Sequence, residues 1–233
     1  MSVTPFAEGP SAAPPVRGFL HSPAIGSGDA LVLSHGAGSN CEAPVLVAVA
    51  TTFADAGFLV LRCDLPFRQA RRTGPPARAD ALRDRDGLRS AVDAVRHIAS
   101  GRVVLGGHSY GGRQASMVAA EEPALTHALL LLSYPLHPPR RAGALRTAHF
   151  PRLRTPALFV HGSRDPFGSL DEVRTAVALI RAPTALLAIE GAAHDLAPGR
   201  RAGRTATPVA AQILAAFLDL IRSVNAAPGP GAN

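Results

Sequence analysis

The chain has 233 residues, a length that fits one α/β domain and hardly two. Hydrophobic residues make up 47% of it, enough for a large core, and 18% are charged, so disorder is expected only at the ends. All 24 basic residues are arginine and, against 17 acidic residues, give a formal net charge of +7. The arginines are spread along the chain and only 5% of residues are aromatic, so we expect no nucleic-acid partner.

The composition also bears on cofactors and location. The two cysteines, Cys41 and Cys63, lack the spacing of metal ligands, so we expect neither a metal nor another cofactor. No N-terminal segment resembles a signal peptide, and no run of 18 apolar residues suggests a membrane partner. The expected protein is cytoplasmic, keeps free thiols and is a monomer or a homodimer.

Strands and helices alternate along the predicted order of elements. Residues 1–15 are rich in proline and alanine and are expected to be a flexible N-terminal segment, 16–224 form the folded domain, and 225–233 form a flexible tail. The expected strands cover 16–20, 30–34, 58–64, a run that begins at Arg102, 128–132, 157–160 and 184–189. The expected helices cover 44–56, 84–99, 113–122, 170–181 and 205–224. This alternation predicts an α/β fold with a doubly wound, mostly parallel sheet, helices on both faces, and function at the carboxyl ends of the strands.

The most informative motif is Gly107-x-Ser109-x-Gly111. An apolar run precedes it and a helical run follows it, which is the context of a nucleophile elbow. In such a turn the serine backbone is strained, and the glycines are needed because their neighbours come too close for a Cβ atom. We therefore expect Ser109 to be a nucleophile raised above the edge of the sheet. A glycine-rich turn with an inert serine is the plainer alternative.

A serine nucleophile needs a base and an orienting carboxylate. His194 lies in a loop just after the last expected strand, and Asp165 follows the strand before that. The chain order Ser109, Asp165, His194 is the order expected for this architecture. Three other acids compete with Asp165 and are less suitable: Asp171 in a helix first turn, Glu190 too close to the strand end, and Asp195 beside the histidine itself.

The loop 35–38, His-Gly-Ala-Gly, follows another strand and predicts an oxyanion hole. Its donors would be the backbone N–H groups of Ala37 and of Tyr110, the residue after the nucleophile. A phosphate-binding loop is disfavoured because the chain has no Gly-x-Gly-x-x-Gly here and no lysine for a P-loop. His35 could brace this loop, and His108 could pack under the elbow.

Four stretches together resemble the α/β-hydrolase superfamily: 33–38, 106–113, 161–168 and 191–195. They are most similar to its small, nearly lidless branch near dienelactone-hydrolase-like proteins, which contains testis-expressed hydrolase-like proteins and a subunit of a histone-acetyltransferase complex. The resemblance implies an α/β-hydrolase fold without a large cap domain and a triad of Ser109, Asp165 and His194. Dienelactone hydrolases proper carry cysteine at the nucleophile, so their substrate is not implied.

Two function classes follow from these residues. The first is a serine hydrolase that cleaves a small-molecule ester or thioester through an acyl-enzyme intermediate. The second is a catalytically silent binding or scaffold protein that keeps the fold. Substrate choice is expected in the irregular segments 65–83 and 134–155, whose arginines, including Arg68 and Arg146, could attract a carboxylate or phosphate or could simply be solvated.

Overall fold

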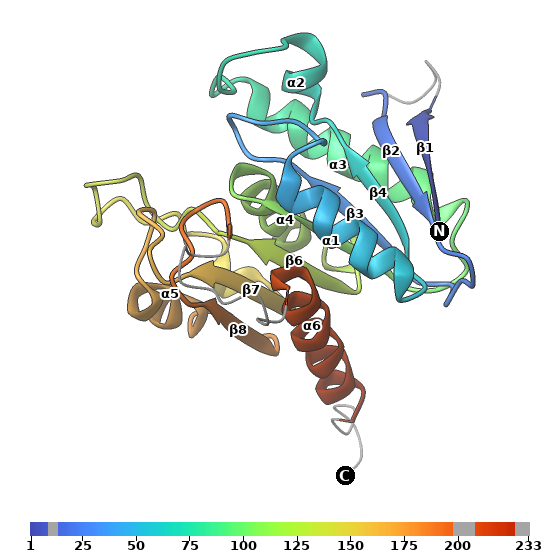
Figure 1. The fold of residues 1–233 in the computed structure, drawn as a ribbon. Helices are drawn as coiled ribbons and strands as arrows, with labels where there is room; N and C mark the ends of the chain where they lie inside the picture. The colour runs from blue at the N-terminus through green and yellow to red at the C-terminus, as the bar shows by residue number, and fades with distance from the viewer. Residues whose placement is uncertain (9–13, 198–207, 227–233) are drawn as a thin grey trace.

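The computed structural model describes residues 1–8, 14–197 and 208–226 (Figure 1). These residues form one eight-stranded sheet in the order β1-β2-β4-β3-β5-β6-β7-β8. Its strands are β1 (Ser2–Ala7), β2 (Arg17–Ser22), β3 (Ala30–Ser34), β4 (Leu59–Cys63), β5 (Val103–His108), β6 (Ala128–Leu132), β7 (Ala157–Gly162) and β8 (Thr184–Ile189). The two pairings that involve β2 are antiparallel, and all later neighbours pair in parallel.

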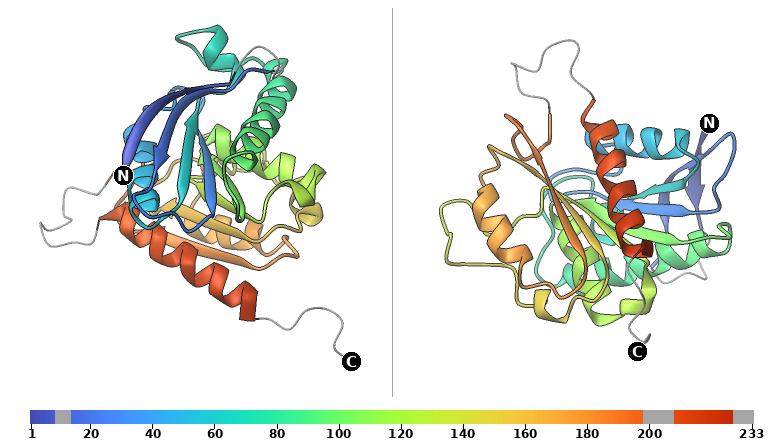
Figure 2. Two further views of the ribbon diagram at one scale, coloured as in Figure 1. Left: turned by 90° about the vertical axis from the view of Figure 1, so that its right-hand side faces the viewer. Right: turned by 90° about the horizontal axis from the view of Figure 1, so that it is seen from below.

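Helices cover both faces of the sheet. They are α1 (Pro44–Asp55), α2 (Pro66–Ala70), α3 (Asp80–Arg96), α4 (Tyr110–Glu121), α5 (Leu170–Val177) and α6 (Val209–Ala226), with short 3₁₀ turns at Pro123–Leu125 and Phe150–Arg152. Helices α1 and α6 lie side by side on one face and enclose one apolar core with the sheet (Figure 2). Helices α3, α4 and α5 enclose the other core on the opposite face. The doubly wound, mostly parallel sheet predicted from the alternation is therefore present.

The central strands are buried on both sides because each face is covered. All five residues of β3 and of β6 are buried, which explains why both read as continuous apolar runs rather than alternating ones. The register places the carboxyl ends of β3 and β5 together, since Ser34 lies opposite Gly107. Loops that follow β3, β5, β7 and β8 thus gather at one edge of the sheet.

The N-terminal prediction was partly wrong. Residues 2–7 were expected to be flexible, but they form the edge strand β1, which pairs antiparallel with β2 from Ser2 opposite Ser22 to Ala7 opposite Arg17. The residues of β1 are mostly exposed, so the sequence shows no apolar pattern over this strand. The strand forms through backbone hydrogen bonds to β2. Residues 9–13 of that predicted segment lie outside the described residues.

Two other boundaries differ from the predictions. The segment 65–83 contains the short helix α2 and the first residues of α3, which begins at Asp80 rather than at residue 84. Helix α6 extends to Ala226, while residues 205–207 of the predicted helix and 227–233 of the predicted tail lie outside the described residues. By length and composition α6 is apolar enough to cross a membrane, yet it packs on the sheet through Ala210, Ile213, Phe217 and Leu220.

Candidate active site

Ser109 occupies a strained turn between β5 and α4. Its backbone has φ 52° and ψ −113°, which is unusual for a residue with a side chain. A Cβ atom at Gly107 would lie 2.5 Å from Ser34 Oγ, and one at Gly111 would lie 2.7 Å from the His35 carbonyl oxygen. Both positions therefore exclude any side chain, as the elbow motif predicts.

The structure brings together the three side chains that the chain order suggested. His194 Nε2 lies 2.8 Å from Ser109 Oγ, and His194 Nδ1 lies 2.7 Å from Asp165 Oδ2. Because the carboxylate accepts the Nδ1 proton, Nε2 is left with a lone pair and can accept the serine proton. The Asp165 side chain is fully buried, whereas that of His194 is 23% exposed, so the site opens to solvent at the imidazole.

Three neighbours hold the imidazole and the carboxylate in place. The Phe167 N–H donates to Asp165 Oδ1 at 2.9 Å, and the Phe167 ring lies 4.2 Å from the His194 ring between centroids. His108 Nε2 donates to the His194 carbonyl oxygen at 2.7 Å, which ties the histidine loop to the elbow. His161, on β7, donates from Nε2 to the Gly168 carbonyl at 2.7 Å and so anchors the loop that carries Asp165.

The competing acids lie elsewhere. Asp171 pairs with Arg174 along α5 at 2.7 Å, in a first turn capped by Ser169. Asp195 is exposed and accepts a hydrogen bond from the Ala197 N–H at 3.1 Å. Glu190 is exposed at the end of β8. Of the four acids considered, Asp165 is the one that contacts the imidazole of His194.

The loop after β3 is held by hydrogen bonds that orient its peptide groups. His35 is buried, and its Nδ1 donates to the Gly36 carbonyl at 2.8 Å while its Nε2 accepts from the Leu65 N–H at 3.1 Å. Those two bonds define a neutral imidazole, in keeping with a pKa that burial lowers. Since the C=O and N–H of one peptide point in opposite directions, the bond to Gly36 O also sets the direction of the Ala37 N–H.

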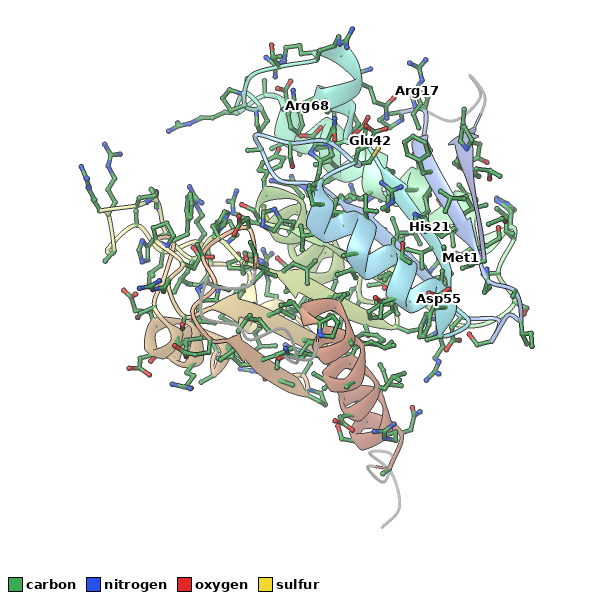
Figure 3. All side chains as sticks on the ribbon, in the orientation of Figure 1. Met1, Arg17, His21, Glu42, Asp55 and Arg68 are labelled. Carbon is green, nitrogen blue, oxygen red and sulfur yellow. The ribbon has the colours of Figure 1, made fainter. Side chains whose placement is uncertain are left out.

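Arg68 is a second support of this loop. The side chain, on α2 beside the loop that follows β3 (Figure 3), is buried. Its guanidinium donates to the carbonyls of Ala37 at 3.1 Å, Ser39 at 2.8 Å and Gly74 at 3.0 Å. The same group lies 5.0 Å from the Phe67 ring centroid. Arg68 thus joins the two loops that follow β3 and β4.

Asp84 supports the elbow in a similar way, through hydrogen bonds. It is fully buried on α3, accepts from the Tyr110 hydroxyl at 2.7 Å and from the Phe67 N–H at 3.0 Å. Burial raises the pKa of this carboxyl above its usual range, and the two hydrogen bonds oppose that shift. Tyr110, the residue after Ser109, is therefore fixed at both its backbone and its side chain.

Sequence reasoning missed the supporting roles of Arg68 and Asp84. A signal for Asp84 was present, because it stands in phase with the apolar stripe of α3 at Leu88, Ala91 and Val95. A carboxylate on the buried face of a helix needs a partner. Nothing comparable marks Arg68, since its partners are backbone carbonyls of loops remote in the sequence.

Neither cysteine forms a hydrogen bond with the side chains of Ser109, Asp165 or His194. Both are free and buried. Burial raises the pKa of the Cys41 thiol to about 12 and also raises that of Cys63. Cys41 lies in the loop after β3, where its N–H donates to Asp64 Oδ1 at 2.8 Å. Both thiols therefore remain protonated at neutral pH.

The fold and the elbow define a class of protein, the α/β hydrolases, and comparison with known families agrees. The α/β hydrolase domain family matches residues 27–222, and the chain belongs to it. The described residues include no large cap domain over the sheet edge, as expected for a small lidless member.

Several solved structures share this fold. Dienelactone hydrolase from Anabaena variabilis is 23% identical, with a TM-score of 0.72 over 94% of this chain and 99% of that one. An α/β serine hydrolase homologue from Coxiella burnetii is 18% identical, with a TM-score of 0.68 over 96% and 98%. XC6422 from Xanthomonas campestris, an α/β serine hydrolase without a lid, is 15% identical, with a TM-score of 0.68 over 98% of both chains. The narrower resemblance to testis-expressed and acetyltransferase-complex proteins stays a prediction.

Proposed function

We propose that the protein is a serine hydrolase that cleaves the ester or thioester bond of a small molecule through an acyl-enzyme intermediate. The observation that carries the proposal is the continuous chain of hydrogen bonds from Ser109 Oγ through His194 to Asp165. The serine hydrolases among the structural neighbours support the same reading. No metal or cofactor is required for this chemistry.

In the first half of the reaction, Ser109 Oγ attacks the carbonyl carbon and His194 Nε2 takes the serine proton. The tetrahedral intermediate collapses as the bond to the leaving oxygen or sulfur breaks, and the imidazolium returns its proton to that atom. In the second half, His194 deprotonates a water molecule that attacks the acyl group. The acid leaves and the proton returns to Ser109. The full cycle consumes one water molecule for each ester or thioester bond that is cleaved.

The developing negative charge on the carbonyl oxygen needs hydrogen-bond donors. In our proposal these are the N–H groups of Ala37 and Tyr110. Their supports differ: the first depends on His35 and Arg68, which hold the loop after β3, and the second on Asp84, which holds the first turn of α4. The N–H of Gly111 also donates to the His35 carbonyl at 3.1 Å, so the two loops are joined directly.

A fluorophosphonate probe tests the proposal, because it reacts covalently with an activated serine and needs no knowledge of the substrate. We expect labelling of the wild type, none of Ser109→Ala, and much weaker labelling of His194→Gln and Asp165→Asn. Ser116→Ala is a matched control, since Ser116 lies on α4 but its hydroxyl bonds to His149 and the Arg113 carbonyl.

Hydrolysis of p-nitrophenyl esters of increasing acyl length would then define the acyl group that the site accepts. Folded wild-type protein that neither reacts with the probe nor hydrolyses any ester would contradict the proposal. It would favour the second function class, a binding or scaffold protein that has kept the fold.

A further inference from the structure

Phe167 lies in the loop after β7, in the same turn as Asp165. The sequence Asp165-Pro166-Phe167 forms an Asx turn, in which the Phe167 N–H donates to Asp165 Oδ1 at 2.9 Å. The other carboxylate oxygen, Oδ2, accepts from His194 Nδ1 at 2.7 Å. One carboxylate therefore holds both the imidazole of His194 and the turn that carries the phenyl ring.

The backbone after this turn is also held. The Phe167 carbonyl accepts a hydrogen bond from the His137 N–H at 3.1 Å, and the next carbonyl, that of Gly168, accepts from His161 Nε2 at 2.7 Å. The Phe167 side chain is half-buried. Backbone bonds on both sides of Phe167 thus set where its ring lies.

The ring lies against the imidazole of His194. Their centroids are 4.2 Å apart and their planes meet at 34°. Among the aromatic ring contacts of the described residues this is the shortest, and the next, between His149 and Phe150, is 5.0 Å. Such a distance and angle are those of an offset stack, so the imidazole lies over the face of the phenyl ring and not at its edge.

The face of a phenyl ring carries negative electrostatic potential, so it attracts a cation and contributes much less to a neutral ring. The attraction is stronger where water is partly excluded, and here the Asp165 side chain is fully buried and that of His194 is 23% exposed. In the proposed mechanism His194 becomes a cation each time it holds the proton of Ser109 or of water. The stack therefore favours the charged state through which both halves of the reaction pass.

We propose that Phe167 is a positioning residue whose ring face stabilises the imidazolium form of His194 during acyl transfer. This inference rests on the proposed hydrolase function and adds to it a residue that acts through the base. The turn of Asp165 couples the two roles, because the carboxylate that orients the imidazole also places the ring against it.

Other ionisable side chains near this imidazole stay unchanged in the test. Asp165 bonds to Nδ1, and His161 Nδ1 lies 3.9 Å from the same carboxylate oxygen. The His108 ring centroid is 5.1 Å from that of His194, and Asp195 is the next residue along the chain. Burial lowers the pKa of His108, so its ring is neutral at neutral pH and adds no second cation.

The test places mono-, di- and trifluorophenylalanine at position 167, because fluorine withdraws electron density from the ring face and nearly keeps the shape of the ring. Hydrolysis of p-nitrophenyl acetate needs neutral His194, so kcat/KM falls at low pH as the imidazole is protonated. A weaker stack makes that protonation require more acid. We expect the midpoint of the acid limb to move to lower pH with each fluorine, by about 0.5 pH unit in all, and the plateau kcat to fall about two- to fivefold.

Substitutions with natural residues and a second position provide the controls. Phe167→Leu should move the midpoint as trifluorophenylalanine does, and Phe167→Tyr should keep it near the wild-type pH. Trifluorophenylalanine at position 53 should leave the midpoint unchanged, because the Phe53 ring packs against Phe58 and Phe217. Variants that lose activity at an unchanged midpoint would overturn the proposal, since the ring would then matter only for packing.

A second measurement needs no turnover. Nuclear magnetic resonance of the His194 ring, followed over pH in Ser109→Ala, gives the pH at which half of the rings carry the second proton. That pH should fall along the same fluorine series, and an unchanged value would overturn the proposal even if the enzyme is active. Failure of the hydrolase function would be seen separately, as absence of fluorophosphonate labelling.

Discussion

At the scale of single residues, the geometry of the site depends on side chains other than Ser109, Asp165 and His194. His35 is the clearest example, because its two ring nitrogens are used by one backbone carbonyl and one backbone N–H. An imidazole in that setting is neutral, and it orients the peptide that precedes Ala37. The contacts that support Ser109, His194 and Asp165 are mostly hydrogen bonds to backbone groups.

Substitution of His35 separates this role from simple packing. In His35→Phe, we expect kcat on p-nitrophenyl esters to fall about 10- to 100-fold with little change in KM, because the loop no longer aims its N–H group. His35→Asn should recover part of kcat, since its amide nitrogen can donate from the position of Nδ1. A folded His35→Phe with wild-type kcat would rule out the positioning role.

At the scale of elements, the elbow shows why the motif needs glycine at two places. The backbone of Gly111 approaches Ser34 and the His35 carbonyl, so even one methyl group would collide with backbone atoms of a central strand and its loop. The close approach of helix α4 to the end of β3 therefore requires a residue without a side chain at Gly111. The collision is steric, because Gly111 is not among the residues with positive φ.

Alanine substitutions at two glycines test this packing. We expect Gly111→Ala to lower the free energy of unfolding by about 3 kcal/mol, as overpacking in a rigid region does. Gly143→Ala should change it by less than about 0.5 kcal/mol, because nothing lies within 4 Å of a Cβ at that position. Urea denaturation of both variants measures the difference, and equal midpoints would show that the elbow can shift to admit a methyl group.

At the scale of the whole molecule, buried histidines make stability depend on pH. Burial, assisted by Arg62, lowers the pKa of His21 to about 4, and burial, assisted by Arg113 and Arg152, lowers that of His149 to about 4. An unfolded chain has histidines near 6.5 and binds these protons first. Stability is therefore full above pH 6.5 and is lost as the pH falls toward 4.

Each of these histidines should account for a loss of about 2 kcal/mol between pH 7 and pH 5. Urea midpoints measured across this range should fall for the wild type and fall less for His149→Gln. His97→Gln, at an exposed residue after α3, should follow the wild type. A His149→Gln profile parallel to that of the wild type would contradict the assignment.

Much of this molecule was determined by its sequence alone. Apolar runs with glycine and proline boundaries predicted strands β3, β6 and β8 at their observed bounds, because buried strands and tight turns need particular residue types in a local order. The elbow motif and the short stretches after β7 and β8 that carry Asp165 and His194 were also local signals, and their order along the chain matched the architecture.

Only the tertiary structure decided the rest. Edge strand β1 forms through backbone bonds that any side chain permits, and the roles of Arg68 and Asp84 arise from partners far away in the chain. Such contacts depend on how the loops after separate strands meet at one edge of the sheet. That meeting is a property of the packed fold, and no short stretch of residues encodes it.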